Sequence, residues 1–206
     1  LTLRESSIMT IILTGFTPFP GVAINPAQVI VERIASDPAY QPYIITEILP
    51  TVFQTAGERL RALIRQHHPD VVICLGVAAG RKKISLERFA LNINDASKPD
   101  NSGLLAQGQP IIPDGQHAYR STLPLEQFYT AIDSLGIPVE YSNYAGAYVC
   151  NHVFYTAQHE IDCSGLNTRA GFIHIPMMTE ANAEEGLPID TMTAAIKACL
   201  ATLTQR

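Results

Sequence analysis

Short apolar runs alternate with amphipathic segments along almost the whole chain, and this alternation constrains the fold more than any other feature of the sequence. Residues 10–14 and 71–75 contain only apolar or β-branched side chains, and each run stops at a glycine. Strands with no polar face are typical of a parallel sheet that is covered on both sides. The segments between the runs repeat apolar residues every three or four positions, which indicates helices. The pattern predicts one α/β domain with a mostly parallel sheet.

The order of the elements follows from the same pattern. Strands are predicted at residues 10–14, 43–49, 71–75, 139–142 and 171–175, with looser alternation over 84–94. Helices are predicted around residues 26–34, 53–64, 125–135, 149–157 and 192–203. We expect Asn25 to cap the first helix, with Pro26 at its first position, and Asp190 to cap the last one.

The region between residues 97 and 115 interrupts the alternation. It is rich in Pro, Gly, Asp and Asn, and a loop of this length in a compact domain is usually functional or forms a covering flap. A hairpin is predicted around residues 110–113 within it.

The chain is predicted to form one domain over residues 9–206. Its length fits one compact domain better than two, and no linker or internal repeat divides it. Met9 directly precedes the first apolar run, so residues 1–8 are interpreted as a disordered upstream extension. No run approaches the ~20 apolar residues that a membrane-spanning helix needs, so we expect no membrane association.

Charge and cysteine content narrow the class of protein. Charged side chains make up only 16% of the chain, against ~25% in typical soluble domains, which indicates an apolar surface that another copy of the subunit covers. A net charge of −5 offers no basic footprint for a nucleic acid. The four cysteines include no CxxC pair and no zinc-ligand spacing, which favours reduced thiols in a cytoplasmic protein without a metal site.

The chain leaves the first predicted strand through residues 15–21, Gly-Phe-Thr-Pro-Phe-Pro-Gly. Ligands of open α/β sheets bind beyond the carboxyl ends of the strands, so this turn is a candidate ligand contact. It lacks the glycine spacing of phosphate-binding loops. Phe16 and Phe19 suit a small apolar ligand, although packing of both rings within the loop itself is an equally good interpretation.

Cys150 differs from the other three cysteines in its position. It follows a turn of small residues after a predicted strand, and it opens the next helix. A thiol at a helix N-terminus meets unpaired N–H groups and the positive end of the helix dipole, which favours the thiolate and can bind an oxyanion. Cys74 and Cys199 occupy ordinary core positions, and Cys163 is predicted to lie in a loop with no partner in view.

A nucleophilic thiolate needs a base, and His174 is one of six histidines in the chain. It is an isolated polar residue in the last apolar strand, near the rim, where either a base or a hydrogen-bonded core role is expected. His152 is two residues from Cys150 and therefore faces another side of the helix. A third group must fix the tautomer of the base. The candidates for this group are Glu87, Asp95 and Asp100, and sequence spacing does not choose among them.

Three segments of the chain match one family in order and approximate spacing. They are Thr-Gly-Phe-Thr-Pro-Phe at 14–19 with Asn-Pro at 25–26; Glu-Arg-Phe-Ala-Leu-Asn at 87–92, continuing through Asp-Ala at 95–96 to Pro-Asp-Asn at 99–101; and Tyr-Ala-Gly-Ala-Tyr-Val-Cys-Asn-His at 144–152, followed by Gly-Phe-Ile-His-Ile-Pro at 171–176. The cysteine segment is the most specific of them. Together they resemble the pyrrolidone-carboxylate peptidases, also called pyroglutamyl peptidase I, a family of cysteine peptidases.

The resemblance implies a three-layer α/β/α sandwich with a mostly parallel, twisted central sheet, like that of phosphorylases and hydrolases. It implies removal of an N-terminal pyroglutamyl (5-oxoprolyl) residue from peptides, without a cofactor, by a homodimer or homotetramer. By this resemblance Cys150 is the nucleophile, His174 its base and Glu87 the carboxylate that orients the histidine. The matching positions of the substrate pocket are Phe16, Phe19, Thr51, Tyr148 and Val149.

The chain departs from the family's pattern at one functional position. Ser97, followed by Lys98, stands where the family usually carries an arginine that is thought to assist the oxyanion site. Arg81, Lys82 or Lys98 can replace it only if the fold brings one of them close. The departure supports an alternative hypothesis, a weakly active or inactive relative that binds pyroglutamyl ligands. A third hypothesis is another α/β enzyme, such as a nucleoside phosphorylase, against which the missing phosphate loop counts.

Overall fold

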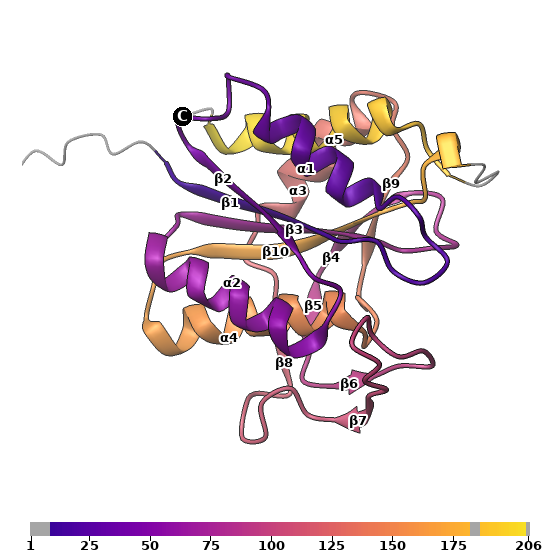
Figure 1. The fold of residues 1–206 in the computed structure, drawn as a ribbon. Helices are drawn as coiled ribbons and strands as arrows, with labels where there is room; N and C mark the ends of the chain where they lie inside the picture. The colour runs from indigo at the N-terminus through magenta and orange to yellow at the C-terminus, as the bar shows by residue number, and fades with distance from the viewer. Residues whose placement is uncertain (1–8, 182–185, 205–206) are drawn as a thin grey trace, which may run out of the picture.

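The computed structural model describes residues 9–181 and 186–204, so the predicted extension over residues 1–8 lies outside the described part. A six-stranded sheet in the order β2-β1-β3-β10-β4-β9 forms its centre (Figure 1). The strands are β1 (Ile11–Phe16), β2 (Ile44–Leu49), β3 (Val71–Val77), β4 (Ile84–Glu87), β9 (Val139–Ser142) and β10 (Arg169–Ile175). The mostly parallel sheet predicted from the sequence is confirmed.

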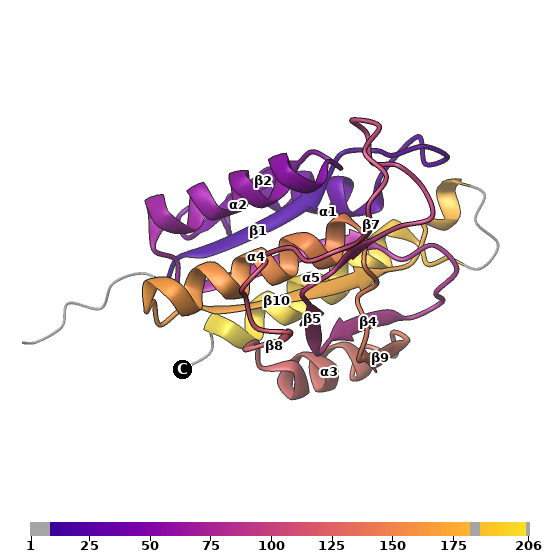
Figure 2. The ribbon, with the colours of Figure 1, turned by 90° about the horizontal axis from the view of Figure 1, so that it is seen from below.

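Helices cover both faces of this sheet, which makes the three predicted layers (Figures 1 and 2). On one face lie α1 (Pro26–Ala35), α3 (Leu125–Asp133) and α5 (Ile189–Thr204), and on the other lie α2 (Phe53–His67) and α4 (Val149–Ser164). Each face has its own apolar core. Ile30, Phe128 and Ile196 belong to the first core, whereas Leu60, Phe154 and Phe172 belong to the second.

One pair of neighbouring strands in the sheet is antiparallel. β4 is antiparallel to β10, with Glu87 opposite Phe172, and β9 is parallel to β4. These two strands therefore run opposite to the other four. The carboxyl end of β4 consequently lies beside the interior of β10 rather than at the rim where β1, β3 and β10 end.

Residues 88–120, which follow β4, form an excursion from the sheet on the side of α2 and α4. β5 (Phe89–Leu91) pairs with β8 (Ala118–Arg120), and β6 (Asn94–Asp95) pairs with β7 (Gln107–Gln109). The hairpin predicted around residues 110–113 is therefore wrong, because the strand before it pairs back to β6. Ile111 and Ile112 pack against the core of α2 and α4 instead of forming a strand.

The helix boundaries confirm one predicted cap and contradict another. The Asn25 side chain accepts a hydrogen bond from the N–H of Ala27 at 3.0 Å, and Pro26 is the first residue of α1. Asp190 does not cap α5, because the helix starts one residue earlier and Asp190 instead forms an ion pair with Arg33. The carboxylate of Glu180, in the short 3-10 helix Thr179–Ala181, accepts the N–H of Ile189.

Within the described residues, no helix has the length and apolar character needed to cross a lipid bilayer.

The cap of α1 makes a prediction about stability. Asn25→Ala removes the acceptor for an N-terminal N–H of the helix and should lower the free energy of unfolding by about 1 kcal/mol. Asn25→Asp keeps an acceptor at the same place and should retain most of that contribution. Urea unfolding followed by circular dichroism measures both variants. An alanine variant as stable as the wild type would contradict this account of the helix start.

Candidate functional site

Cys150 is the second residue of α4, and its sulfur lies against the centre of the sheet. A β-carbon built on Gly76 of β3 would stand 2.8 Å from the Cys150 sulfur and 2.7 Å from the ring of Phe172. The sulfur thus occupies space that a side chain at residue 76 would need. Gly76 is paired in register with His174 of β10, and residues paired in this way share a sheet face. The thiol and the imidazole are therefore brought to the same face by neighbouring strands.

His174 is held by a buried carboxylate. Its side chain is only 4% exposed, and its Nδ1 lies 2.7 Å from Oε1 of Glu87, which is fully buried. An ionised carboxylate can only accept a hydrogen bond from the ring nitrogen, so Nδ1 carries the hydrogen and Nε2 is left to exchange a proton. Asp95 and Asp100, the other two candidates for this position, form no hydrogen bond or ion pair with His174, whose partner is Glu87.

Arg81 is a second partner of the same carboxylate, which the sequence did not indicate. Its Nη1 lies 2.6 Å from Glu87 Oε1, and its Nη2 donates to the backbone oxygen of Tyr144 at 3.0 Å. Burial by itself raises the pKa of Glu87. The hydrogen bond and charge of His174, followed by a hydrogen bond from Ser142 and the charge of Arg81, reverse this effect and lower the pKa of Glu87 below its ordinary value. Glu87 is therefore ionised at neutral pH.

The surroundings of Cys150 favour the protonated thiol over the thiolate. Burial raises its pKa to about 12, the charge of Glu87 adds to this effect, and Arg81 opposes it. The sequence prediction that the helix N-terminus favours a thiolate is thus outweighed by loss of hydration. A thiol in this state needs a nearby base at the moment of reaction.

Cys150 opens onto a cavity of about 160 Å³. All five pocket residues predicted from the resemblance line it. The complete lining is Phe16, Phe19, Asn25, Thr51, Val77, Ala79, Tyr148, Val149 and Cys150. None of these side chains carries a charge at neutral pH. The cavity therefore suits a small and uncharged group.

The walls of this cavity are tied together through Thr17 and Thr51. The Thr51 hydroxyl donates to the backbone oxygen of Thr17 at 2.8 Å, and the Thr51 N–H donates to the Thr17 hydroxyl at 3.1 Å. Asn25 also donates to the Thr17 backbone oxygen, at 3.2 Å. These bonds hold the turn that follows β1, and with it Phe16 and Phe19, against the start of α2.

Asp100 and Asn101 extend this connection to the excursion. Asp100 is buried, and its carboxylate accepts the N–H of Phe53, the first residue of α2, at 3.0 Å. The side-chain amide of Asn101 donates to the backbone oxygen of Pro18 at 2.9 Å. The backbone N–H of Asn101 donates to the backbone oxygen of Thr51 at 3.0 Å. Asp100 therefore has a structural role, and its place in the Pro-Asp-Asn segment at 99–101 was the sequence signal for it.

His152 faces another side of α4, as predicted. Its Nδ1 lies 3.0 Å from the side-chain oxygen of Asn94, and its ring packs edge-on against Phe53. Burial lowers the pKa of His152 to about 4, and the charge of Arg61 acts in the same direction. It is a neutral packing residue at physiological pH.

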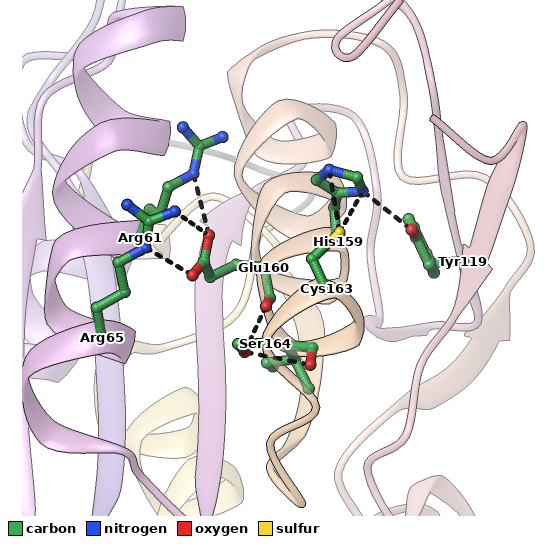
Figure 3. A network of polar contacts seen from close by, with 8 residues as sticks. Arg61, Arg65, Tyr119, His159, Glu160, Cys163 and Ser164 are labelled. Carbon is green, nitrogen blue, oxygen red and sulfur yellow. Dashed lines mark hydrogen bonds and ion pairs between the residues drawn. The ribbon is translucent and has the colours of Figure 1, made fainter. Parts of the chain in front are cut away.

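Cys163 lies in the last turn of α4, so the predicted loop is wrong at this residue. It is exposed, and its sulfur lies 3.6 Å from Nε2 of His159, which in turn contacts the hydroxyl of Tyr119 (Figure 3). On the neighbouring face of α4, Glu160 pairs with Arg61 and Arg65 of α2. This network joins the two helices at the far end of α4 from Cys150.

Residue 97, at which the chain departs from the family's pattern, lies beside the Cys150 cavity rather than in it. Ser97 and Lys98 line a second, neighbouring cavity. Of the cations considered as replacements for the absent arginine, Arg81 reaches the site as an ion-pair partner of Glu87. Its guanidinium is engaged by that carboxylate and by the Tyr144 backbone oxygen.

Comparison with known proteins identifies relatives along almost the entire chain. The sequence model of one family, described as pyroglutamyl peptidase, matches residues 9–206. The chain is similar to the pyrrolidone-carboxylate peptidase of Bacillus licheniformis, with 42% identity over 91% of this chain and 88% of the relative. The corresponding protein of Thermosipho melanesiensis is 45% identical over 82% of this chain and 83% of the relative.

Solved structures agree with these relatives. The fold matches the crystal structure of pyroglutamyl peptidase I from Bacillus amyloliquefaciens with a TM-score of 0.88 and 39% identity, covering 94% of both chains. It matches pyrrolidone carboxyl peptidase from Pyrococcus furiosus with a TM-score of 0.88 and 33% identity, covering 94% of this chain and 97% of the other. The chain belongs to the pyroglutamyl peptidase family.

Proposed function

We propose that this protein hydrolyses the bond between an N-terminal pyroglutamyl residue and the rest of a peptide, with Cys150 as nucleophile, His174 as base and Glu87 as the carboxylate that orients the base. Membership of the family supports the reaction. The observation that carries the proposal is that Cys150 and the five predicted pocket residues line one cavity.

The cavity explains how such a substrate would be recognised. A pyroglutamyl ring is a flat lactam with no charge, so the ion pairs that ordinary aminopeptidases form with a free amino terminus are of no use. Phe16 and Phe19 supply apolar contact, and Thr51, Tyr148 and Val149 complete the slot. Backbone groups of the walls then discriminate the lactam N–H and C=O from the ring of proline.

The proposed reaction begins with transfer of the Cys150 proton to Nε2 of His174 as the sulfur attacks the carbonyl carbon. The ionised Glu87 stabilises the imidazolium, which forms in a buried position. The oxyanion accepts hydrogen bonds from N–H groups at the start of α4, where helix geometry leaves them without intrahelical partners. His174 then gives its proton to the leaving amine, and a thioester remains. Water, deprotonated by His174, releases pyroglutamate.

We further propose that the protein works in a reducing compartment, the cytoplasm, and as a homo-oligomer. All four cysteines are free thiols, including the exposed Cys163. Leu104 and Leu105 in the excursion are 53% and 44% exposed, which supports burial against a second copy.

Self-association is tested by light scattering at micromolar concentration. The expected mass is two or four times the 22.5 kDa of the single chain. Leu104→Glu combined with Leu105→Glu should shift the mass toward one chain, because charge at these positions opposes burial. A wild-type mass of one chain would contradict the proposal.

The role of Cys150 is tested with a pyroglutamyl-coumarin substrate. Cys150→Ala should lower kcat/KM by about 10⁴-fold or more, because the nucleophile and the covalent step are lost together. Cys163→Ala is the matched control, since this thiol is exposed and lies far along α4, and it should stay within about twofold of the wild type. Equal rates for wild type and Cys150→Ala would refute the proposal. Binding of a pyroglutamyl peptide without turnover by the wild type would favour the inactive relative.

The lowered pKa of Glu87 predicts how stability depends on pH. A carboxylate whose pKa is lower in the folded state contributes stability above its unfolded value, and this contribution is lost as the pH falls through the folded pKa. Glu87→Gln should therefore cost about 3 kcal/mol in urea unfolding at pH 7, with the difference narrowing at pH 3.5. The exposed Glu126→Gln serves as control and should change little. A difference in unfolding free energy between wild type and Glu87→Gln that stays constant with pH would contradict an ionised Glu87 in the folded protein.

A further inference from the structure

A second cavity of about 400 Å³ lies next to the Cys150 cavity. Phe19 and Tyr148 line both, so the two spaces meet at these rings. The remaining walls of the second cavity come from residues 95–99, Pro20 and Ala147. If the first residue of a peptide fills the smaller cavity with its carbonyl at Cys150, the residue after the scissile bond needs an adjoining space of this kind.

The wall that carries Lys98 is fixed on both sides. The N–H of Asp95 donates to the Ala147 backbone oxygen at 2.9 Å, and the N–H of Ala96 donates to that of Ala106 at 3.1 Å. On the other side, the Tyr148 hydroxyl donates to the backbone oxygen of Pro99 at 3.0 Å. The segment around Lys98 is thus held to the same elements that form the Cys150 cavity.

Lys98 brings a positive charge to this wall that the fold itself does not use. Its side chain is exposed and has no ion-pair or hydrogen-bond partner among residues 9–181 and 186–204. Small side chains at Ala96 and Ser97 leave the cavity open beside it. Asp95 lines the same cavity with the opposite charge and also has no side-chain partner there.

We propose that the second cavity binds the residue that follows pyroglutamate, and that Lys98 favours substrates with a carboxylate on that residue. The carboxylate belongs either to an Asp or Glu side chain or to the C-terminus of a dipeptide. The inference rests on the proposed function and names its substrate class. Attraction between exposed charges is modest, so the expected preference is about three- to fivefold.

Four substrates separate the two sources of the carboxylate. They are pyroglutamyl-glutamine amide, pyroglutamyl-glutamate amide, pyroglutamyl-glutamine with a free C-terminus, and pyroglutamyl-lysine amide. The glutamate and glutamine amides differ only in side-chain charge, and the two glutamine peptides differ only in terminal charge. We expect kcat/KM to be three- to fivefold higher for at least one carboxylate substrate than for glutamine amide, and lowest for lysine amide. In 1 M NaCl the preference should shrink, because the Debye length falls to about 3 Å.

Variants assign the preference to the wall of the cavity. Lys98→Met should reduce the carboxylate-to-amide ratio to about one, and Asp95→Asn should increase it. Lys83→Met removes a lysine that lines neither cavity and should leave the ratio as in the wild type. A wild-type ratio of one for both carboxylate substrates, or a ratio that Lys98→Met does not change, would overturn the inference.

Binding measurements separate this inference from the proposed function. Calorimetry with Cys150→Ala compares the affinities of the same uncleaved peptides, whether or not the wild type turns them over. Tighter binding of a carboxylate peptide, lost in the Cys150→Ala, Lys98→Met double variant, supports the second cavity even if the hydrolase assay fails. Equal affinities for the charged and neutral peptides overturn it even if hydrolysis is fast.

Discussion

The contact on which the site depends is that of one buried carboxylate with two nitrogen-bearing side chains. Glu87 has no exposure to water, and both His174 and Arg81 reach its Oε1 within 2.7 Å. Burial without such partners would protonate the carboxylate, and the imidazole would then lose the acceptor that fixes its tautomer. The histidine therefore contributes most to keeping Glu87 ionised, and Ser142 and Arg81 act in the same direction. Arg81 also binds the Tyr144 backbone oxygen, so it connects this charge to the loop that leads into α4.

Much of the fold was predictable because it depends on local pattern. Fully apolar strands and amphipathic helices fix the layers, and the Asn25-Pro26 pair fixes the start of α1 at the residue where it occurs. The errors arose where a distant residue competes with a local signal. Asp190 has the composition of a helix cap, yet Glu180 takes that position and Asp190 pairs with Arg33. Residues 110–113 have the composition of a hairpin turn, yet the strand before them, β7, pairs with β6 and not with a strand that follows the turn.

Some residues of the candidate site could be predicted from local sequence patterns, and others only from the resemblance to a family. Placement at a helix start singled out Cys150, and a polar residue in an apolar strand singled out His174. Spacing could not choose Glu87 over Asp95 or Asp100, because the choice depends on β4 running antiparallel to β10, which no local pattern reveals. The resemblance to a family supplied that choice. The sequence offers Arg81 as a replacement cation and places Asn101 in a motif, but it does not indicate their contacts with Glu87 and Pro18, because these contacts depend on the folded path of the chain.

Asp100 connects three parts of the molecule that lie apart in the sequence. Its carboxylate receives the first N–H of α2, its neighbour Asn101 holds the turn that carries the two phenylalanines, and the following residues lead into the excursion. These hydrogen bonds connect the pocket walls to the first turn of α2, so we expect the two to lose their structure together when the bonds break. A fluctuation that frays this helix also dismantles the slot, so binding in the slot protects amides at the start of α2 that no ligand touches.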